Sequence, residues 1–163
     1  MLDMLQTRYY DGANSGLSPC VCTCQMDFGP DTDGLIAPDQ VAAYKRFGDW
    51  IRSCYGSAVA FVSGVVAVNQ TLSLRVDAAV DRVMVREDQT DGQVIRGYEV
   101  EAENPAGTWT RMSSGHSVGN KRIDVIGPSL KHARALRLRI TAVAPGSVVA
   151  KVTHFGAYAQ CSD

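Results

Sequence analysis

The sequence predicts a mainly β protein: an antiparallel two-sheet β-sandwich preceded by one short α-helix. Apolar and polar residues alternate in segments such as Leu72 to Val76 and Leu136 to Ile140, which is the period of a strand with one buried face. Turn signatures such as Asp91-Gly92 and Pro145-Gly146 separate these segments. Because parallel strands are usually buried on both faces and do not alternate, the pattern indicates antiparallel strands.

The chain before the strands divides into two parts. Residues 1–27 show no sustained period of 2 or 3.6, so an irregular segment is expected there. Residues 28–57 hold a turn cluster from Gly29 to Gly34 and then Pro38, a residue typical of a first helical position, with Gly56 where a helix stop is expected. The apolar residues between them repeat at helical spacing: Val41, Tyr44, Phe47, Ile51 and Tyr55.

Residues 58–163 are predicted to form the sandwich domain, because the period changes to two after Gly56. Eight strands are expected. They lie near Ala58 to Val68, Leu72 to Val76, Val80 to Arg86, Val94 to Glu103, Trp109 to Met112, Arg122 to Ile126, Leu136 to Ile140 and Val148 to Tyr158.

Size and composition limit the functions that can be expected. A chain of 163 residues suits one compact domain with an appendage. Apolar residues make up 45% and charged residues 20%, without the run of about 20 apolar residues that a membrane helix requires. The net charge of −1 is not that of a nucleic-acid-binding domain. We therefore expect neither a membrane span nor a nucleic-acid partner.

Five cysteines and the sequon Asn69-Gln70-Thr71 favour an oxidising compartment, so an extracellular or lysosomal location in the secretory pathway is expected, although no signal peptide is recognisable. Cys20, Cys22 and Cys24 do not have zinc-ligand spacing, which favours a disulfide or oxidation-prone segment. Because the number of cysteines is odd, at least one must stay free or pair between chains.

A series of landmarks in the second half of the chain, taken in order and spacing, closely resembles the C-terminal domain of the α-L-fucosidases. The landmarks are Val83 to Asp88, Gly92 to Ile95, Tyr98 to Glu101, Trp109, Gly115 to Ile123 and Leu136 to Ile140. Upstream, Phe28 to Ile36 and Gly48 to Ile51 resemble the last strand, loop and helix of that family's catalytic barrel. The resemblance covers Phe28 to Tyr158, and residues 1–25 depart from it.

The resemblance implies a galactose-binding-like, or discoidin-like, jelly roll without the catalytic barrel. Retaining glycosidases hold two carboxyl groups about 5–5.5 Å apart, and in this family they lie on barrel strands that the sequence lacks. Hydrolysis of fucosides is therefore not expected. Discoidin-like domains bring their termini together, which implies a Cys54 to Cys161 disulfide. No cofactor is expected; the resemblance leaves open a structural calcium ion on sandwich loops, with no ligands assigned.

Several carboxylates are interpreted as structural. Glu87 and Asp88 are neighbours on a strand and point to opposite faces, so they are expected to bind local backbone rather than form a catalytic pair. Alternation places Glu99, Glu101 and Glu103 on a solvated face. The run from Asp31 to Gly34 is interpreted as turn chemistry before a helix, since it lacks the glutamate of a calcium loop.

Glycan binding requires an aromatic face and a few polar groups that converge from loops. Near turns, the sequence offers Trp109, His116, Asn120, Lys121 and Arg122 as ligand-binding candidates. A buried core position for Trp109 and a hairpin role for Gly115 to Ile123 are the alternatives.

Two functions compete at this point. The first is a non-catalytic, lectin-like module that recognises sugars or cell-surface glycans. The alternative is an interaction module that self-associates through the helix Pro38 to Tyr55 or docks onto a full-length α-L-fucosidase, because the apolar stripe of that helix needs cover without a barrel.

Overall fold

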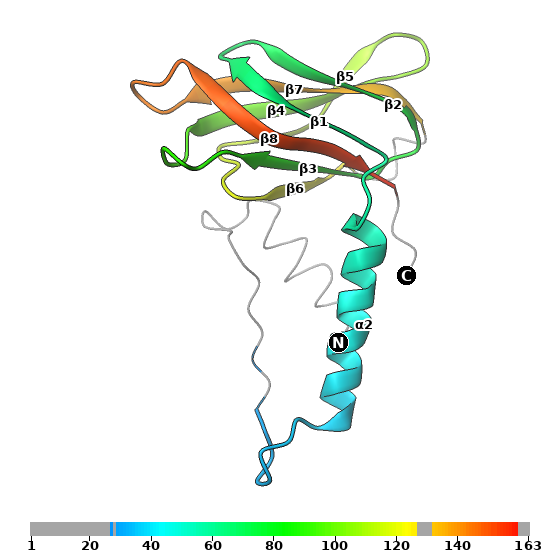
Figure 1. The fold of residues 1–163 in the computed structure, drawn as a ribbon. Helices are drawn as coiled ribbons and strands as arrows, with labels where there is room; N and C mark the ends of the chain where they lie inside the picture. The colour runs from blue at the N-terminus through cyan, green and yellow to red at the C-terminus, as the bar shows by residue number, and fades with distance from the viewer. Residues whose placement is uncertain (1–26, 28, 127–131, 160–163) are drawn as a thin grey trace.

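The computed structural model describes residue 27, residues 29–126 and residues 132–159 (Figure 1). The irregular segment predicted at residues 1–27 lies, except for residue 27, outside the described residues. The same holds for the cysteines at positions 20, 22, 24 and 161.

Helix α2 spans Pro38–Tyr55, as predicted, with Pro38 in its first turn, Asp39 beside the positive end of the helix dipole and Arg52 in the last turn. The backbone N–H of Gly56 donates to Arg52 O at the end of the helix. Before the helix, Asp31 Oδ1 accepts hydrogen bonds of 2.9 Å from the N–H groups of Asp33 and Leu35. The interpretation of this segment as a turn is confirmed.

Eight strands form two four-stranded sheets in which every observed pairing is antiparallel, which confirms the predicted sandwich. One, named here the β8 sheet, has the order β1-β8-β3-β6; the other, the β7 sheet, has the order β2-β7-β4-β5. The strands are β1 (Ala60–Ala67), β2 (Thr71–Ala78), β3 (Arg82–Glu87), β4 (Ile95–Glu103), β5 (Trp109–Gly115), β6 (Arg122–Val125), β7 (Ala133–Val143) and β8 (Val149–Tyr158).

The core lies between the two sheets. Val83, Val85 and Phe155 contribute to it from the β8 sheet, and Val100 and Leu138 from the β7 sheet, all fully buried. Burying one such side chain stabilises the fold by about 1.5–3 kcal/mol. Since side chains alternate along a strand, residues next to these core positions point outward and form the two outer faces of the sandwich.

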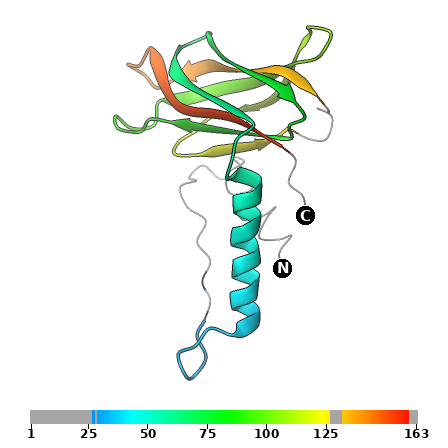
Figure 2. The ribbon, with the colours of Figure 1, turned by 45° about the vertical axis from the view of Figure 1, so that its right-hand side comes forward.

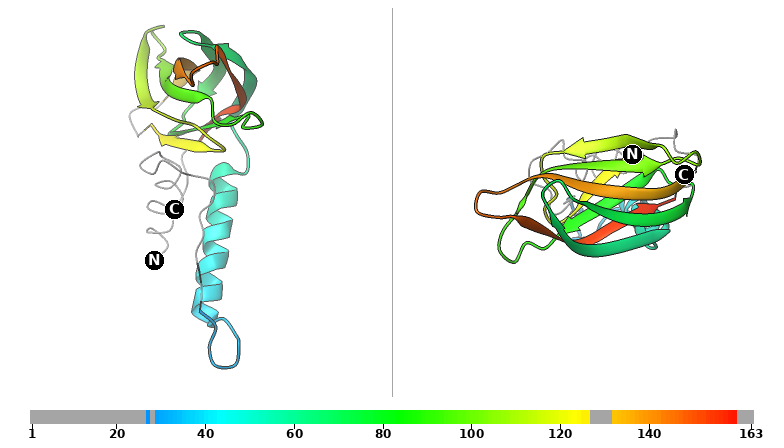
Figure 3. Two further views of the ribbon diagram at one scale, coloured as in Figure 1. Left: turned by 90° about the vertical axis from the view of Figure 1, so that its left-hand side faces the viewer. Right: turned by 90° about the horizontal axis from the view of Figure 1, so that it is seen from above.

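Helix α2 extends away from the side of the sandwich that the β8 sheet forms (Figures 2 and 3). Its buried residues are Ala43, Phe47, Trp50 and Cys54. This differs from the predicted stripe of Val41, Tyr44, Phe47, Ile51 and Tyr55: Phe47 is buried and Ile51 and Tyr55 are half-buried, but Val41 and Tyr44 are exposed. Trp50 stacks on Phe47 and meets Tyr55 edge-on, so the buried face of the helix is centred on these rings and Cys54.

Candidate functional site

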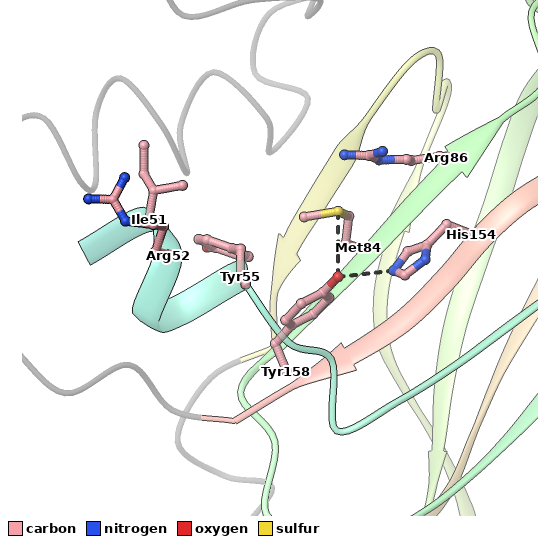
Figure 4. A pocket seen from close by; sticks show the side chains of 8 residues that line it. Ile51, Arg52, Tyr55, Met84, Arg86, His154 and Tyr158 are labelled. Atoms are coloured by element: carbon pink, nitrogen blue, oxygen red, sulfur yellow. Dashed lines mark hydrogen bonds between the residues drawn. The ribbon is translucent and has the colours of Figure 1, made fainter. Parts of the chain in front are cut away.

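A pocket of about 270 Å³ lies where the C-terminal end of α2 meets the outer face of the β8 sheet (Figure 4). Helix, β3 and β8 each contribute side chains to it. The side chains and the one glycine that line it are Ile51, Arg52, Tyr55 and Gly56 from the helix end, Met84 and Arg86 from β3, and His154 and Tyr158 from β8.

The Tyr158 hydroxyl is at the centre of the polar contacts in this pocket. It lies 3.0 Å from His154 Nε2 and donates to Met84 Sδ over 3.8 Å (Figure 4). The Tyr55 ring lies against the Tyr158 ring, with centroids 5.5 Å apart. The last residue of the helix and the last residue of β8 therefore build one aromatic wall of the pocket.

His154 is held from the side of β1 by the ring of Phe61, which stacks on it at 5.4 Å although Phe61 itself is 66% exposed. Gly156 is required for this arrangement, because a Cβ at that position would collide with the His154 ring. The glycine thus makes room on β8 for an imidazole that lies over the strand.

The pocket is positively charged. Burial lowers the pKa of His154, and the nearby Arg86 lowers it further; burial raises the pKa of Tyr158. Both groups are therefore neutral near pH 7. The charge comes from Arg52 and Arg86. Arg52 donates to Asp49 Oδ1 at 2.5 Å, whereas no Asp or Glu lines the pocket within the described parts of the chain.

Glu87, at the end of β3, fixes two loops beside this site. Glu87 is only 5% exposed. Its carboxylate accepts hydrogen bonds from the backbone N–H groups of Val94, Ile95 and Gly119, at 3.0, 2.9 and 2.6 Å. The next residue, Asp88, accepts from the N–H and hydroxyl of Thr90. The prediction of local backbone binding is confirmed for Asp88, whereas Glu87 binds backbone that is not local, since Gly119 lies 32 residues further along the chain.

The outer face of the β7 sheet carries a ladder of opposite charges. Glu99 pairs with Arg139 and Arg111, and Glu101 pairs with Arg137 at 2.7 Å. The two arginines hold the pKa of Glu99 below its usual range through their hydrogen bonds. The prediction that these glutamates occupy an exposed face is confirmed, and ionised carboxylates already paired with arginine are poor candidates for catalysis.

Trp109 lies on this same outer face and not in the core. It is half-buried, and the Arg137 guanidinium lies 4.2 Å from the centroid of its ring. Trp109 is the first of the seven residues of β5, so the length of the strand, about 20 Å, separates it from the β5–β6 loop. The structure therefore does not bring Trp109 together with the other predicted ligand residues.

The other four predicted residues lie close together at the β5–β6 loop and the start of β6. His116 and Asn120 are exposed, and Lys121 is half-buried. Arg122 donates from Nε to Asp124 Oδ1 at 2.7 Å, and its side chain is 11% exposed. The Arg122 side chain is therefore mostly buried and already paired with Asp124, whereas His116 and Asn120 are exposed to solvent.

Asp124 is the acceptor of a buried network. Besides Arg122, it accepts hydrogen bonds from the Tyr98 hydroxyl at 2.8 Å and from Ser113 Oγ at 2.7 Å. Burial is the main cause of a strongly raised pKa of Tyr98, with the Asp124 charge adding to it. Every polar atom that the network contributes has a partner, so its role is to hold β6 against β4 and β5.

The residues of the pocket were not predicted as a site. Alternation along Val149–Tyr158 places His154, Gly156 and Tyr158 on one face, the outer one, and an outer face that carries a histidine, a glycine and a tyrosine is a usable signal. The contributions of Tyr55 and Arg86 could not be found in this way, because they depend on strand register and on where the helix ends.

Within residue 27, residues 29–126 and residues 132–159, no group of three or more His, Cys, Asp or Glu side chains is arranged to hold a metal ion. The calcium ion that the resemblance left open on sandwich loops has no ligand set among those residues. The helix in the same ranges is not long and apolar enough to span a membrane.

Comparison with solved structures shows what the architecture resembles. A putative α-L-fucosidase from Bacteroides thetaiotaomicron superimposes with a TM-score of 0.82 and 28% identity over 98% of this chain, but over only 34% of its own. The chain is built like the C-terminal region of the α-L-fucosidases. The resemblance predicted from the sequence motifs is confirmed, and so is the fold. This fucosidase-like chain spans about a third of the length of that relative.

Two further structures share the fold. A GH29 fucosidase from Ruminococcus gnavus, solved in complex with fucose, matches with a TM-score of 0.80 at 19% identity over 99% of this chain and 37% of its own. A family 32 carbohydrate-binding module from Streptococcus pneumoniae EndoD matches with a TM-score of 0.50 at 11% identity, over 60% of this chain and 75% of its own. No family model and no curated protein matches the sequence.

Proposed function

We propose that this chain is a non-catalytic, lectin-like module that binds a sugar or a cell-surface glycan outside the cytosol. The pocket between α2 and the β8 sheet carries the proposal, because it combines aromatic rings from Tyr55 and Tyr158 with polar groups from His154 and Arg86. Sugars present both a C–H surface, which packs on an aromatic ring, and hydroxyl groups, which need donors and acceptors.

The size of the pocket fits a small ligand. Ligand sites usually measure about 300–1,000 Å³, and the pocket volume of about 270 Å³ lies just below that range. We infer that the pocket accepts one sugar residue, such as the terminal unit of a glycan. The neighbouring exposed ring of Phe61, stacked on the half-buried His154, offers surface for a second unit.

The β5–β6 loop supports a wider binding surface. The N–H of Glu87 donates to Gly119 O at 3.1 Å, which places the loop beside the residue that follows Arg86. We propose His116, Asn120, Lys121 and Arg122 as secondary ligand contacts at this edge. Trp109 stays a separate candidate on the other outer face, where a stacked sugar would have to compete with Arg137.

The proposal includes no hydrolysis. In the part of the chain that the structure describes, the elements are one helix and the two sheets of a sandwich, and the chain spans about a third of its fucosidase relatives. A catalytic carboxylate pair is expected on the barrel strands of that family. A chromogenic fucoside should therefore give no turnover above the buffer rate.

A glycan array followed by calorimetric titration of the hits tests the binding function. We expect saturable binding that His154→Ala weakens at least about tenfold, as expected when a buried ligand contact is lost. His132→Ala is the matched control, because His132 is exposed, pairs with Asp77 and does not line the pocket. If no glycan on the array gives a signal and the titrations show no heat of binding up to millimolar concentration, the proposal is wrong.

A second function, a homodimer formed through α2 or docking onto a full-length α-L-fucosidase, is favoured by a different observation. Leu35, Ile36 and Val41 are exposed, and Ile36 and Val41 line a second pocket of about 700 Å³ beside the helix. Light scattering of the wild type and of Val41→Asp tests self-association. A strict monomer at high concentration excludes the homodimer, and sedimentation with an active fucosidase tests the docking.

A further inference from the structure

We infer that the pocket selects sugars that carry a carboxylate, such as uronic acids, and that Arg86 is the residue that makes this selection. The inference rests on the proposed function and names its ligand class. It follows from the position of Arg86, from the partners of the neighbouring arginines and from the lining of the pocket.

Arg86 points outward by strand alternation. Val85 is fully buried in the core, and Arg86 lies opposite His154 in the pairing of β3 with β8. Figure 4 shows the Arg86 side chain extending from β3 toward the helix side of the pocket, with Tyr158 and Tyr55 across from it. The guanidinium is thus within the same pocket as the aromatic rings that we assign to the sugar.

Arg86 differs from the other arginines around it in the partners it has. Arg52 pairs with Asp49, Arg82 pairs with Asp81, and Arg122 pairs with Asp124. Arg86 contributes only its backbone carbonyl, which accepts a hydrogen bond from the Thr153 hydroxyl. Among the described residues, no carboxylate lies within ion-pair distance of the Arg86 guanidinium, so its donors remain available to a ligand.

The surroundings strengthen the preference for an anion. No acidic side chain lines the described pocket, and Met84, Ile51 and Tyr55 contribute apolar groups to the same lining, which lowers the polarity around an anion bound there. A planar guanidinium binds a carboxylate through two parallel hydrogen bonds. A neutral hexose has no group that can replace that interaction, since a hydroxymethyl group is neither planar nor charged.

The test compares sugars that differ only at one carbon. Three pairs of sugars are titrated by calorimetry into the full chain, each pair with one neutral and one acidic member. The pairs are galactose and galacturonic acid, glucose and glucuronic acid, and mannose and mannuronic acid. We expect at least one acid to bind about tenfold or more tightly than its neutral partner, the difference that one charge-assisted pair supplies. Acetate alone should not bind, because it lacks the ring that packs on the tyrosines.

Two variants decide whether Arg86 is responsible. Arg86→Gln should reduce the affinity for the acid to that for the neutral sugar. Arg75→Gln, a matched loss of one charge at an exposed position on β2 of the other sheet, should leave the preference unchanged. Both are surface substitutions and are expected to fold, which thermal melts can verify.

The outcomes separate this inference from the proposed function. Equal affinity within all three pairs, binding of neutral sugars only, or a preference that survives in Arg86→Gln would overturn the assignment to Arg86 while the binding function stands. A chain that binds none of these sugars and nothing on a glycan array would overturn both.

Discussion

The rings of Tyr55 and Tyr158 lie with their centroids 5.5 Å apart and their planes inclined by 56°. Tyr55 is the last residue of α2 and Tyr158 is the last residue of β8. This contact therefore joins the only described helix to the sandwich at one point, and it also forms the aromatic wall of the candidate sugar pocket.

Tyr55→Ala should destabilise the chain by about 2 kcal/mol, because it removes an aromatic pair worth about 0.5–1.5 kcal/mol beyond its buried area. Urea unfolding followed by circular dichroism measures the change. Val41→Ala, on the exposed side of the same helix, should change the stability by less than about 0.5 kcal/mol. Equal losses in the two variants would contradict the role given to the Tyr55 contact.

The Cys54 to Cys161 disulfide stays a prediction, since Cys161 lies outside the described residues. Cys54 is 4% exposed and precedes Tyr55, while Cys161 follows Tyr158 by three residues, a reach of about 10 Å. A bridge here would stabilise by about 4–5 kcal/mol in the chain-entropy model. Peptide mapping without reductant should recover the linked pair, and a free Cys161 thiol would refute it.

Glu87→Gln should loosen both loops that the carboxylate holds. Its bonds to the Val94, Ile95 and Gly119 N–H groups are charge-assisted, and the substitution should cost about 1–3 kcal/mol. Hydrogen exchange should accelerate at these three amides more than at core amides of β7. Asp91→Asn, an exposed acid in the adjacent loop, serves as the control, and similar exchange in both variants would argue against the clamp.

Tyr98→Phe should destabilise the sandwich by about 1–3 kcal/mol, because the buried Asp124 carboxylate then loses one of its three donors. Differential scanning calorimetry measures the loss. Ser114→Ala, at an exposed position of β5, changes no bond of this network and should leave the melting temperature within about 1 °C. A neutral effect of Tyr98→Phe would show that the network does not stabilise the fold.

Acidification should destabilise the chain through His154. Burial and Arg86 lower its pKa in the folded state, so the unfolded chain takes up the proton first. This contribution to stability is complete above the ordinary pKa of about 6.5 and is lost as the pH falls toward the folded pKa. The groups that face the ring are Arg86 on β3, Tyr158 on β8 and Phe61 on β1.

Melting temperatures between pH 8 and pH 5.5 test this expectation. His154→Gln should show a shallower decline than the wild type over that range, because the substitution removes the group that titrates. His116 and His132 are present in both proteins, so their contributions cancel. Parallel pH profiles for the two proteins would contradict the assignment to His154.

The sequence by itself determined the elements. The change from helical spacing to a period of two after Gly56 predicted the helix Pro38–Tyr55 and all eight strands, most within two residues of their observed ends. Local chemistry sufficed because proline, glycine and the alternation of burial act on neighbours in the chain. The backbone role of Asp88 was predictable for the same reason, whereas the Glu87 bond to Gly119 spans 32 residues and depends on the fold.

Only the tertiary structure decided the site. Tyr55 and Tyr158 are about a hundred residues apart in the sequence, and Arg86 meets His154 only because β3 pairs with β8 in one particular register. The length of β5 separated Trp109 from the β5–β6 loop, and the buried face of α2 includes Trp50, which the predicted stripe did not contain. Alternation along a strand predicts the face of the sheet on which a side chain lies, but strand order and register decide which other side chains that side chain contacts.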